Sequence, residues 1–132
     1  MRAFRGLNVW KKSHALALAV FIATQHVKRG SYPGLVSQIR RSAASIPANI
    51  AEGCGHSGQR EFARFLQMAL ASASELEYHL LLALDLGLLP RANYAELDRG
   101  VVEVKRMLSS LIARVRAATE RQPREPDGYG PG

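Results

Sequence analysis

Apolar residues in this chain recur at steps of three and four positions in four separate segments. In the third segment one stripe alternates the two steps without a fault from Phe62 to Gly87, through Leu66, Ala69, Ala73, Leu76, Leu80 and Ala83. Such spacing places the apolar side chains on one face of an α-helix, and no segment shows the strict alternation that is typical of a strand. The pattern therefore predicts an all-α chain with helices at about residues 7–27, 35–54, 59–86 and 93–119.

The other three segments carry stripes of the same kind. The second segment places Val36, Ile39, Ala43, Ile46 and Ile50 on one face. The fourth does the same with Leu97, Val101, Val104, Leu108, Leu111, Val115 and Ala118. In the first segment the predicted core face includes Trp10, Leu16, Ala17, Val20 and Phe21. These side chains are the candidate core of the protein.

Polar and glycine residues mark the expected ends of the helices. Asn8 and Ser57 are placed to cap the starts of the first and third helices. Gly53 and Gly55 are expected to supply the left-handed backbone that ends the second helix. The connections between helices are short, which favours antiparallel neighbours, and sustained 3-4 spacing favours a left-handed twist.

These features together predict an antiparallel up-down four-helix bundle. The bundle occupies residues 1–120, and a flexible tail rich in proline and glycine follows at residues 121–132. Helices one to three carry more apolar residues than one buried face requires, with Phe65 and Leu81 beside the main stripe of the third. The surplus predicts burial between subunits of a homo-oligomer, and wider burial inside one bundle is the alternative interpretation.

The second helix also carries a row of short polar side chains beside a proline. Pro47 removes one backbone donor and is expected to bend the helix. We interpret the row as a structural hydrogen-bond network across helices, with contact to a ligand or a protein partner as the alternative. Glu75 and Glu77 are expected to pair with Arg40 or Arg41 of a neighbouring helix or subunit. The predicted network consists of Gln38, Ser45, Asn49 and Glu52.

Basic residues concentrate in the first part of the chain. The formal net charge is +7, but residues 1–51 hold eight lysines and arginines and no acidic residue, whereas residues 52–132 hold ten basic and eleven acidic residues. This asymmetry predicts an anionic partner, nucleic acid first and a membrane surface second. The candidate nucleic-acid-binding residues are Arg2, Arg5, Lys11, Lys12, Lys28, Arg29, Arg40 and Arg41.

The expected mode of binding is to the backbone or the shape of RNA or DNA. Few aromatic side chains are free to stack on bases, because Trp10 and Phe21 are predicted to lie in the core. A scaffold whose basic face binds an acidic protein is one alternative, and a basic protein kept soluble by its charge is another. No apolar run approaches the roughly 20 residues that span a bilayer, so a membrane location is not expected.

Residues that could support catalysis or metal binding are scattered. No glutamate has a histidine three positions later, as a di-metal bundle site requires. Glu75 and His79 read as a surface pair on one helix, and Cys54 with His56 lacks a third ligand or an orienting acid. We therefore expect no enzymatic activity, no cofactor and no metal. A single cysteine suits a reducing cytoplasm.

The segments RRSAASIPANIAEG and SELE, with the apolar runs around them, carry a resemblance to a known family. From Phe4 to Ala118 the chain resembles a bacterial family of four-helix bundles. That family includes proteins encoded in ribosomal RNA intervening sequences and the accessory variability determinants of diversity-generating retroelements. The resemblance implies an up-down bundle assembled as a pentameric ring. It implies association with structured ribosomal RNA in one branch, and with nucleic acid and a reverse transcriptase in the other.

Overall fold

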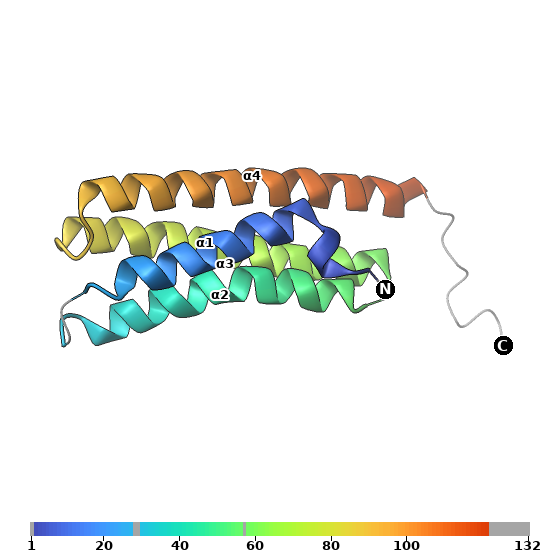
Figure 1. Cartoon of the computed structure of the whole chain (residues 1–132). Helices are drawn as coiled ribbons and strands as arrows, with labels where there is room; N and C mark the ends of the chain where they lie inside the picture. Colours follow the sequence, from blue (N-terminus) through green and yellow to red (C-terminus); the bar gives the residue numbers. More distant parts are fainter. Residues whose placement is uncertain (1, 28–29, 57, 122–132) are drawn as a thin grey trace.

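The computed structural model describes residues 2–27, 30–56 and 58–121, and in these ranges the chain is helical without a strand (Figure 1). The predicted all-α fold is confirmed, and each helix end lies within three residues of its predicted position. Arg121, assigned to the tail by the sequence, belongs to the last helix, and residues 122–132 lie outside the described residues. The elements are the 3-10 helix η1 (Phe4–Gly6) and the α-helices α1 (Asn8–Thr24), α2 (Pro33–Cys54), α3 (Gln59–Asp85) and α4 (Arg91–Arg121).

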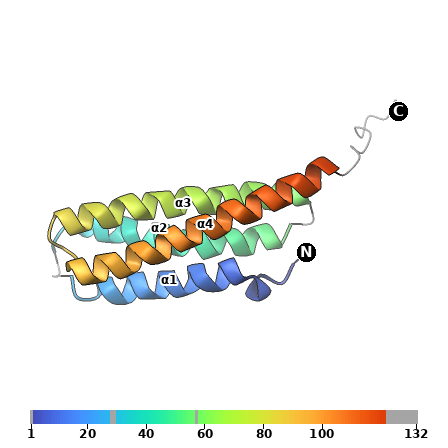
Figure 2. The same cartoon turned by 90° about the horizontal axis from the view of Figure 1, so that it is seen from above.

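The four helices form a closed up-down bundle. Each of α1 and α3 packs against both α2 and α4, and successive helices run in opposite directions (Figures 1 and 2). The starts of α1 and α3 therefore lie at the same end of the bundle as the ends of α2 and α4. In both views α4 projects past its neighbours at that end. Of the described helices, none combines the length and the apolar character needed to cross a membrane.

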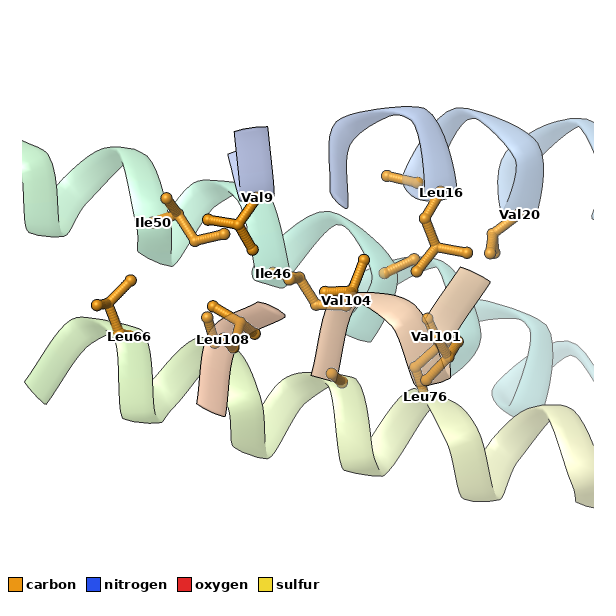
Figure 3. Close-up of a cluster of buried hydrophobic side chains, with 14 of the residues drawn as sticks. Val9, Leu16, Val20, Ile46, Ile50, Leu66, Leu76, Val101, Val104 and Leu108 are labelled. Atoms are coloured by element: carbon orange, nitrogen blue, oxygen red, sulfur yellow. The ribbon is translucent and has the colours of Figure 1, made fainter. Parts of the chain in front are cut away.

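The core is made of the predicted stripes. The α3 stripe is buried from Phe62 to Ala83, and only Gly87, in the turn after the helix, is exposed. Figure 3 shows side chains of all four helices pointing into one interior, among them Ile50 of α2, Leu66 of α3 and Leu108 of α4. Burial of such side chains contributes roughly 1.5–3 kcal/mol each, and this is what holds the helices together.

The core face of α1 differs from the prediction. Ser13 and Thr24 are buried there, because each hydroxyl donates to a carbonyl of its own helix: Ser13 Oγ to Trp10 O at 3.0 Å and Thr24 Oγ1 to Val20 O at 2.9 Å. A hydroxyl that is satisfied in this way can lie in an apolar interior. Phe21, predicted to be core, remains 39% exposed at the edge of the helix, and Trp10 is half-buried.

The core face of α4 also shifts once along its length. Ile112 is buried where the even 3-4 alternation predicted Leu111, which is half-buried. The observed stripe takes two successive steps of four, from Val104 to Leu108 and then to Ile112. An α-helix has 3.6 residues per turn, so over 31 residues a strict alternation drifts away from the core and one such correction restores it.

The predicted helix ends are partly wrong. Asn8 is the first helical residue of α1, and the cap residue before it is Leu7, whose side chain makes no capping hydrogen bond. Gly58 precedes α3, and Ser57 lies outside the described residues. The prediction of left-handed backbone at the end of α2 is wrong, because Gly55 has φ −76° and among described glycines positive φ occurs at Gly30 and Gly87.

Gly53 is needed for a different reason, namely close packing against α3. A Cβ atom at this position would lie 2.8 Å from Phe65 Cβ and 3.2 Å from an edge carbon of the Phe62 ring. Heavy atoms do not approach that closely without displacing one helix. Gly53 therefore permits the end of α2 to lie against the start of α3.

We predict opposite effects of alanine at two glycines of α2. Gly53→Ala should lower the free energy of unfolding by about 1–3 kcal/mol, since the added methyl overpacks the α2–α3 contact. Gly34→Ala should raise it by up to about 1 kcal/mol, because nothing lies within 4 Å of its Cβ position and alanine favours the helix. Chemical denaturation of both variants measures the difference. Equal effects at the two positions would show that the close approach at Gly53 has no energetic weight.

Candidate nucleic-acid interface

The bundle gathers positive charge at one end. When each α-helix is divided at its midpoint, the half of the bundle that contains the start of α1 comprises residues 2–16, 44–56, 58–72 and 106–121. We call this half the cationic pole. Its described residues include three acidic side chains, Glu52, Glu61 and Glu120, and ten basic ones: Arg2, Arg5, Lys11, Lys12, Arg60, Arg64, Arg106, Arg114, Arg116 and Arg121.

The opposite half of the bundle is close to neutral. Its described residues include five basic side chains (Arg40, Arg41, Arg91, Arg99 and Lys105) and six acidic ones (Glu75, Glu77, Asp85, Glu96, Asp98 and Glu103). The separation follows from topology, because six of the eight acidic residues of α3 and α4 lie in the halves of these helices next to the turn that joins them. Six of their nine basic residues lie in the other halves. The surface potential is therefore polarised along the bundle axis.

Arg5, Lys11 and Lys12 lie on the surface of the cationic pole. Arg5 and Lys11 are exposed, and within the described part of the chain neither pairs with a carboxylate. Lys12 Nζ lies 3.4 Å from an oxygen of Glu103, and about half of each side chain is exposed. A pair this exposed contributes little to stability and is weakened further by salt. All three basic side chains are therefore accessible to a polyanion.

Arg2 has a structural role instead. Its guanidinium donates a hydrogen bond to Gln59 Oε1 and lies 4.0 Å from the centre of the Phe62 ring. Its backbone N–H donates to Cys54 O at 2.8 Å. These contacts tie the segment before α1 to the end of α2 and the start of α3, so Arg2 contributes charge to the pole from a fixed, half-buried position.

Arg40 and Arg41 lie away from the pole. Arg40 Nε donates to Thr24 Oγ1 at 2.8 Å, and the guanidinium lies 5.2 Å from the centre of the Phe21 ring, so this residue joins α1 to α2. Arg41 is exposed in the neutral half. Lys28 and Arg29 lie outside the described residues. The structure thus does not bring Arg40 and Arg41 together with the cations near the start of α1.

Six of the ten basic residues of the pole are not predicted from the sequence. In the charge of consecutive segments, the cations of α3 and α4 are cancelled by nearby glutamates and aspartates. An up-down topology reverses every second helix, so charge must be summed by bundle end. The signal was present in the sequence, since the last third of the fourth predicted helix contains Arg114 and Arg116 and no acidic residue. The missed residues are Arg60, Arg64, Arg106, Arg114, Arg116 and Arg121.

The predicted polar network forms in part. Ser45 Oγ and Ser72 Oγ lie 2.9 Å apart and join α2 to α3, and Asn49 Nδ2 donates to Ser45 O at 2.9 Å and to Ser45 Oγ at 3.0 Å. Gln38 and Glu52 are exposed, and in the described structure their side chains make no hydrogen bond of this network. The network is therefore smaller than predicted and lies where α2 faces α3.

Three further predictions for α2 and α3 concern Pro47, Glu77 and Glu75, and the partner predicted for Glu77 is wrong. α2 continues through the buried Pro47 to Cys54 without a break. Glu77 pairs with Lys105 of α4 at 2.9 Å rather than with an arginine of α2. Glu75 lies 3.9 Å from His79 Nδ1, as its spacing on one helix predicted.

The arrangement around Cys54 does not favour thiol chemistry. Burial raises the pKa of the Cys54 thiol, and the nearby Arg2 opposes this only in part. His56 is stacked on the Phe65 ring, with the ring centres 4.9 Å apart. Throughout residues 2–27, 30–56 and 58–121, no three histidine, cysteine or acidic side chains gather closely enough to hold a metal ion.

Comparisons with known proteins extend this description. Residues 5–110 match a family model described as "23S rRNA-intervening sequence protein". The chain is also similar to the crystal structure of a protein of unknown function from the S23 ribosomal protein family of Bacteroides thetaiotaomicron. The two chains are 28% identical, with a TM-score of 0.74, over 79% of this chain and 97% of that one. No curated protein matches the chain.

Proposed function

The chain belongs to the 23S rRNA-intervening sequence protein family, and we propose that it is a non-enzymatic protein that binds the backbone of nucleic acid through its cationic pole. The observation that supports this proposal is that the described residues at one end of the bundle include ten basic and three acidic side chains. Exposed lysine and arginine side chains bind phosphates and release the condensed counterions, which favours association. The family's description favours ribosomal RNA as the natural source of those phosphates.

The side chains of the pole suit backbone binding rather than base reading. The large exposed aromatic residues of the described chain, Phe21, Tyr32 and Tyr78, all lie in the neutral half. Among the described aromatic residues of the pole, Phe62 and Phe65 are buried and Phe4 and Trp10 are half-buried. None of these four offers a fully exposed face on which a base could stack, which favours recognition by phosphate contacts and by shape.

Nucleic-acid binding that depends on the pole can be measured by titration. Affinity for nucleic acid should fall with salt: the logarithm of the binding constant should fall linearly with the logarithm of the salt concentration, with a slope of about −0.9 per phosphate contacted on duplex DNA. Arg5→Glu should weaken binding more than Arg41→Glu, because both arginines are exposed but only Arg5 lies at the pole. Fluorescence anisotropy at two salt concentrations checks both statements.

Two results would count against the proposal. Absence of binding to both RNA and DNA at low salt would favour the alternative function, a scaffold whose basic face binds an acidic protein. Equal losses from Arg5→Glu and Arg41→Glu would mean that the net charge of the chain, rather than its cationic pole, controls the affinity.

We also propose that the protein works as a homo-oligomer, held together by the outer face of α1. Leu18 and Ile22 are 53% and 59% exposed, and Ala15 and Ala19 lie exposed beside them. An apolar helix face of this kind, without a charged residue between Ala15 and Ile22, favours contact with a second copy of the chain. The pentameric number comes from the family resemblance, as does a reverse transcriptase partner in the retroelement branch.

Assembly through α1 predicts a position-dependent effect of one added charge. Ile22→Glu should shift the protein toward monomers, because the carboxylate would be desolvated in the subunit contact. Val102→Glu is the matched control, since Val102 is also an exposed apolar residue, 40% accessible, but on α4. Sedimentation analysis of both variants gives the result. An unchanged mass for Ile22→Glu would exclude the outer face of α1 as the contact.

A further inference from the structure

Two grooves lined by arginine flank the C-terminal half of α4. The first, of about 460 Å³, runs between α4 and the segment that joins η1 to α1, and Arg106 and Arg114 line it together with Asn8 and Ser110. We call it the α1–α4 groove. The second, of about 440 Å³, runs between α4 and the start of α3. It is the α3–α4 groove, and Arg60, Arg64 and Arg116 line it.

The two grooves differ in how far their charge is neutralised. No acidic side chain lines the α1–α4 groove, and within the described chain Arg106 and Arg114 are exposed and form no ion pair. In the α3–α4 groove Glu120 is part of the lining, Arg64 is held by Glu61 at 3.2 Å, and Arg116 donates to Gln67 at 3.3 Å. Both grooves are thus cationic, and the arginines of the α1–α4 groove are less neutralised by neighbouring side chains.

Small side chains cover the surface of α4 between the grooves. Ser109, Ala113 and Ala117 are exposed there, and we call this strip the α4 ridge. No aromatic residue and no long amide side chain lies on the ridge, so it has nothing with which to stack on a base or to read a base edge deep in a groove. Short side chains instead allow a sugar-phosphate backbone to approach the helix surface closely.

We propose that the α4 ridge and its two flanking grooves form a docking site for double-stranded RNA. The inference rests on the proposed nucleic-acid function and deepens it. The ridge lies across the shallow minor groove of an A-form duplex. Arginines on its two sides contact phosphates of the two strands, and Ser109 and Ser110 meet the 2′-hydroxyls.

Shape distinguishes this ligand from duplex DNA. The start of α3 and the η1–α1 junction flank α4 on its two sides, and these walls limit how deeply the helix can enter a nucleic-acid groove. A helix flanked in this way cannot reach the floor of the B-DNA major groove, which is about 8.5 Å deep, and the B-DNA minor groove, about 6 Å wide, is too narrow for a helix about 10–12 Å across. The wide and shallow minor groove of A-form RNA accepts such a ridge and presents 2′-hydroxyls to it.

The inference changes which part of the chain contacts the ligand. The predicted contacts lay in residues 1–51, whereas this site uses α4 and the start of α3, with the η1–α1 junction as one wall. α4 contributes arginines to both grooves, so its C-terminal half is the central element of the interface. The outer face of α1, which we assign to subunit contact, remains separate from it.

The test compares the full-length protein with paired variants of α4. The probes are an RNA duplex and a DNA duplex of the same sequence, and the readout is affinity at several salt concentrations. The double variant Arg106→Glu with Arg114→Glu should reduce the magnitude of the salt slope on RNA by at least about 1.8, because two phosphate contacts are lost and two carboxylates repel the backbone. Arg91→Glu with Arg99→Glu is the matched control, since both arginines are exposed on the neutral half of the same helix.

A second pair of variants tests the ridge without changing charge. Ala113→Phe should weaken RNA duplex binding by about tenfold or more, a loss of the size that one central interface contact produces. Ala95→Phe should leave it unchanged, because Ala95 lies five helical turns away on the same exposed face of α4. Thermal unfolding followed by circular dichroism verifies that all four variants keep the helical fold.

Each outcome bears on a different statement. Equal binding of RNA and DNA duplexes, or unchanged binding by Ala113→Phe, would show that the α4 ridge is not a docking site for duplex RNA, while leaving a nucleic-acid function in place. Equal losses of affinity from the two pairs of arginine variants would show that the arginines of the grooves do not contact the phosphates. No binding of any nucleic acid by the unmodified protein would instead remove the proposed function itself.

Discussion

Burial of one apolar stripe per helix in an antiparallel bundle is the constraint on which the rest of this structure depends. The interior is made by aliphatic side chains of all four helices, with Leu66, Leu76 and Leu108 among those fully buried. Ion pairs between helices, Lys12 with Glu103 and Lys105 with Glu77, are partly exposed and add little by comparison. Packing alone therefore decides which helix ends meet, and with them which charges meet.

The antiparallel packing of the helices places basic and acidic residues, which are mixed along α3 and α4, mostly at different ends of the bundle. Along the chain, α3 and α4 have nearly balanced charge, and nothing in their totals suggests a binding surface. In space, most of their arginines lie at the same end of the bundle as the cations before and within α1, while most of their carboxylates lie in the half next to the α3–α4 turn. A separation of this kind steers a polyanion toward one end of the protein and orients it on arrival.

Much of the fold could be predicted from spacing. The α3 stripe from Phe62 to Ala83 was identified in full, because regular steps of three and four residues are a direct consequence of helical geometry. The burial of Ser13 and Thr24 could not be predicted in this way, since a hydroxyl becomes compatible with a core only through a hydrogen bond to its own helix. Gly53 was noticed for its backbone freedom, but its role is set by Phe65 on another helix, and such a contact is invisible in local sequence.

The candidate site could be predicted less completely than the fold. Arg5, Lys11 and Lys12 were identified because they lie in a stretch without acidic residues, whereas Arg106 and Arg114 belong to a helix whose total charge is lowered by four carboxylates, most of them in its first half. Arg40 shows the opposite error, since a cation that was counted as available is committed to Thr24 and Phe21. The charge of an arginine does not tell whether it binds a ligand or packs within the protein. The contacts that it makes in the folded chain distinguish the two roles.

The most direct test of the account is amide hydrogen exchange of the full-length protein with and without duplex RNA. If the cationic pole is the binding surface, exchange should slow at the start of α1 and in the C-terminal half of α4, where the ligand covers fraying helix ends. Exchange around the α3–α4 turn, at the neutral end, should stay the same. Protection centred on that turn, with none at the pole, would contradict the claim that charge gathered by the bundle topology defines the interface.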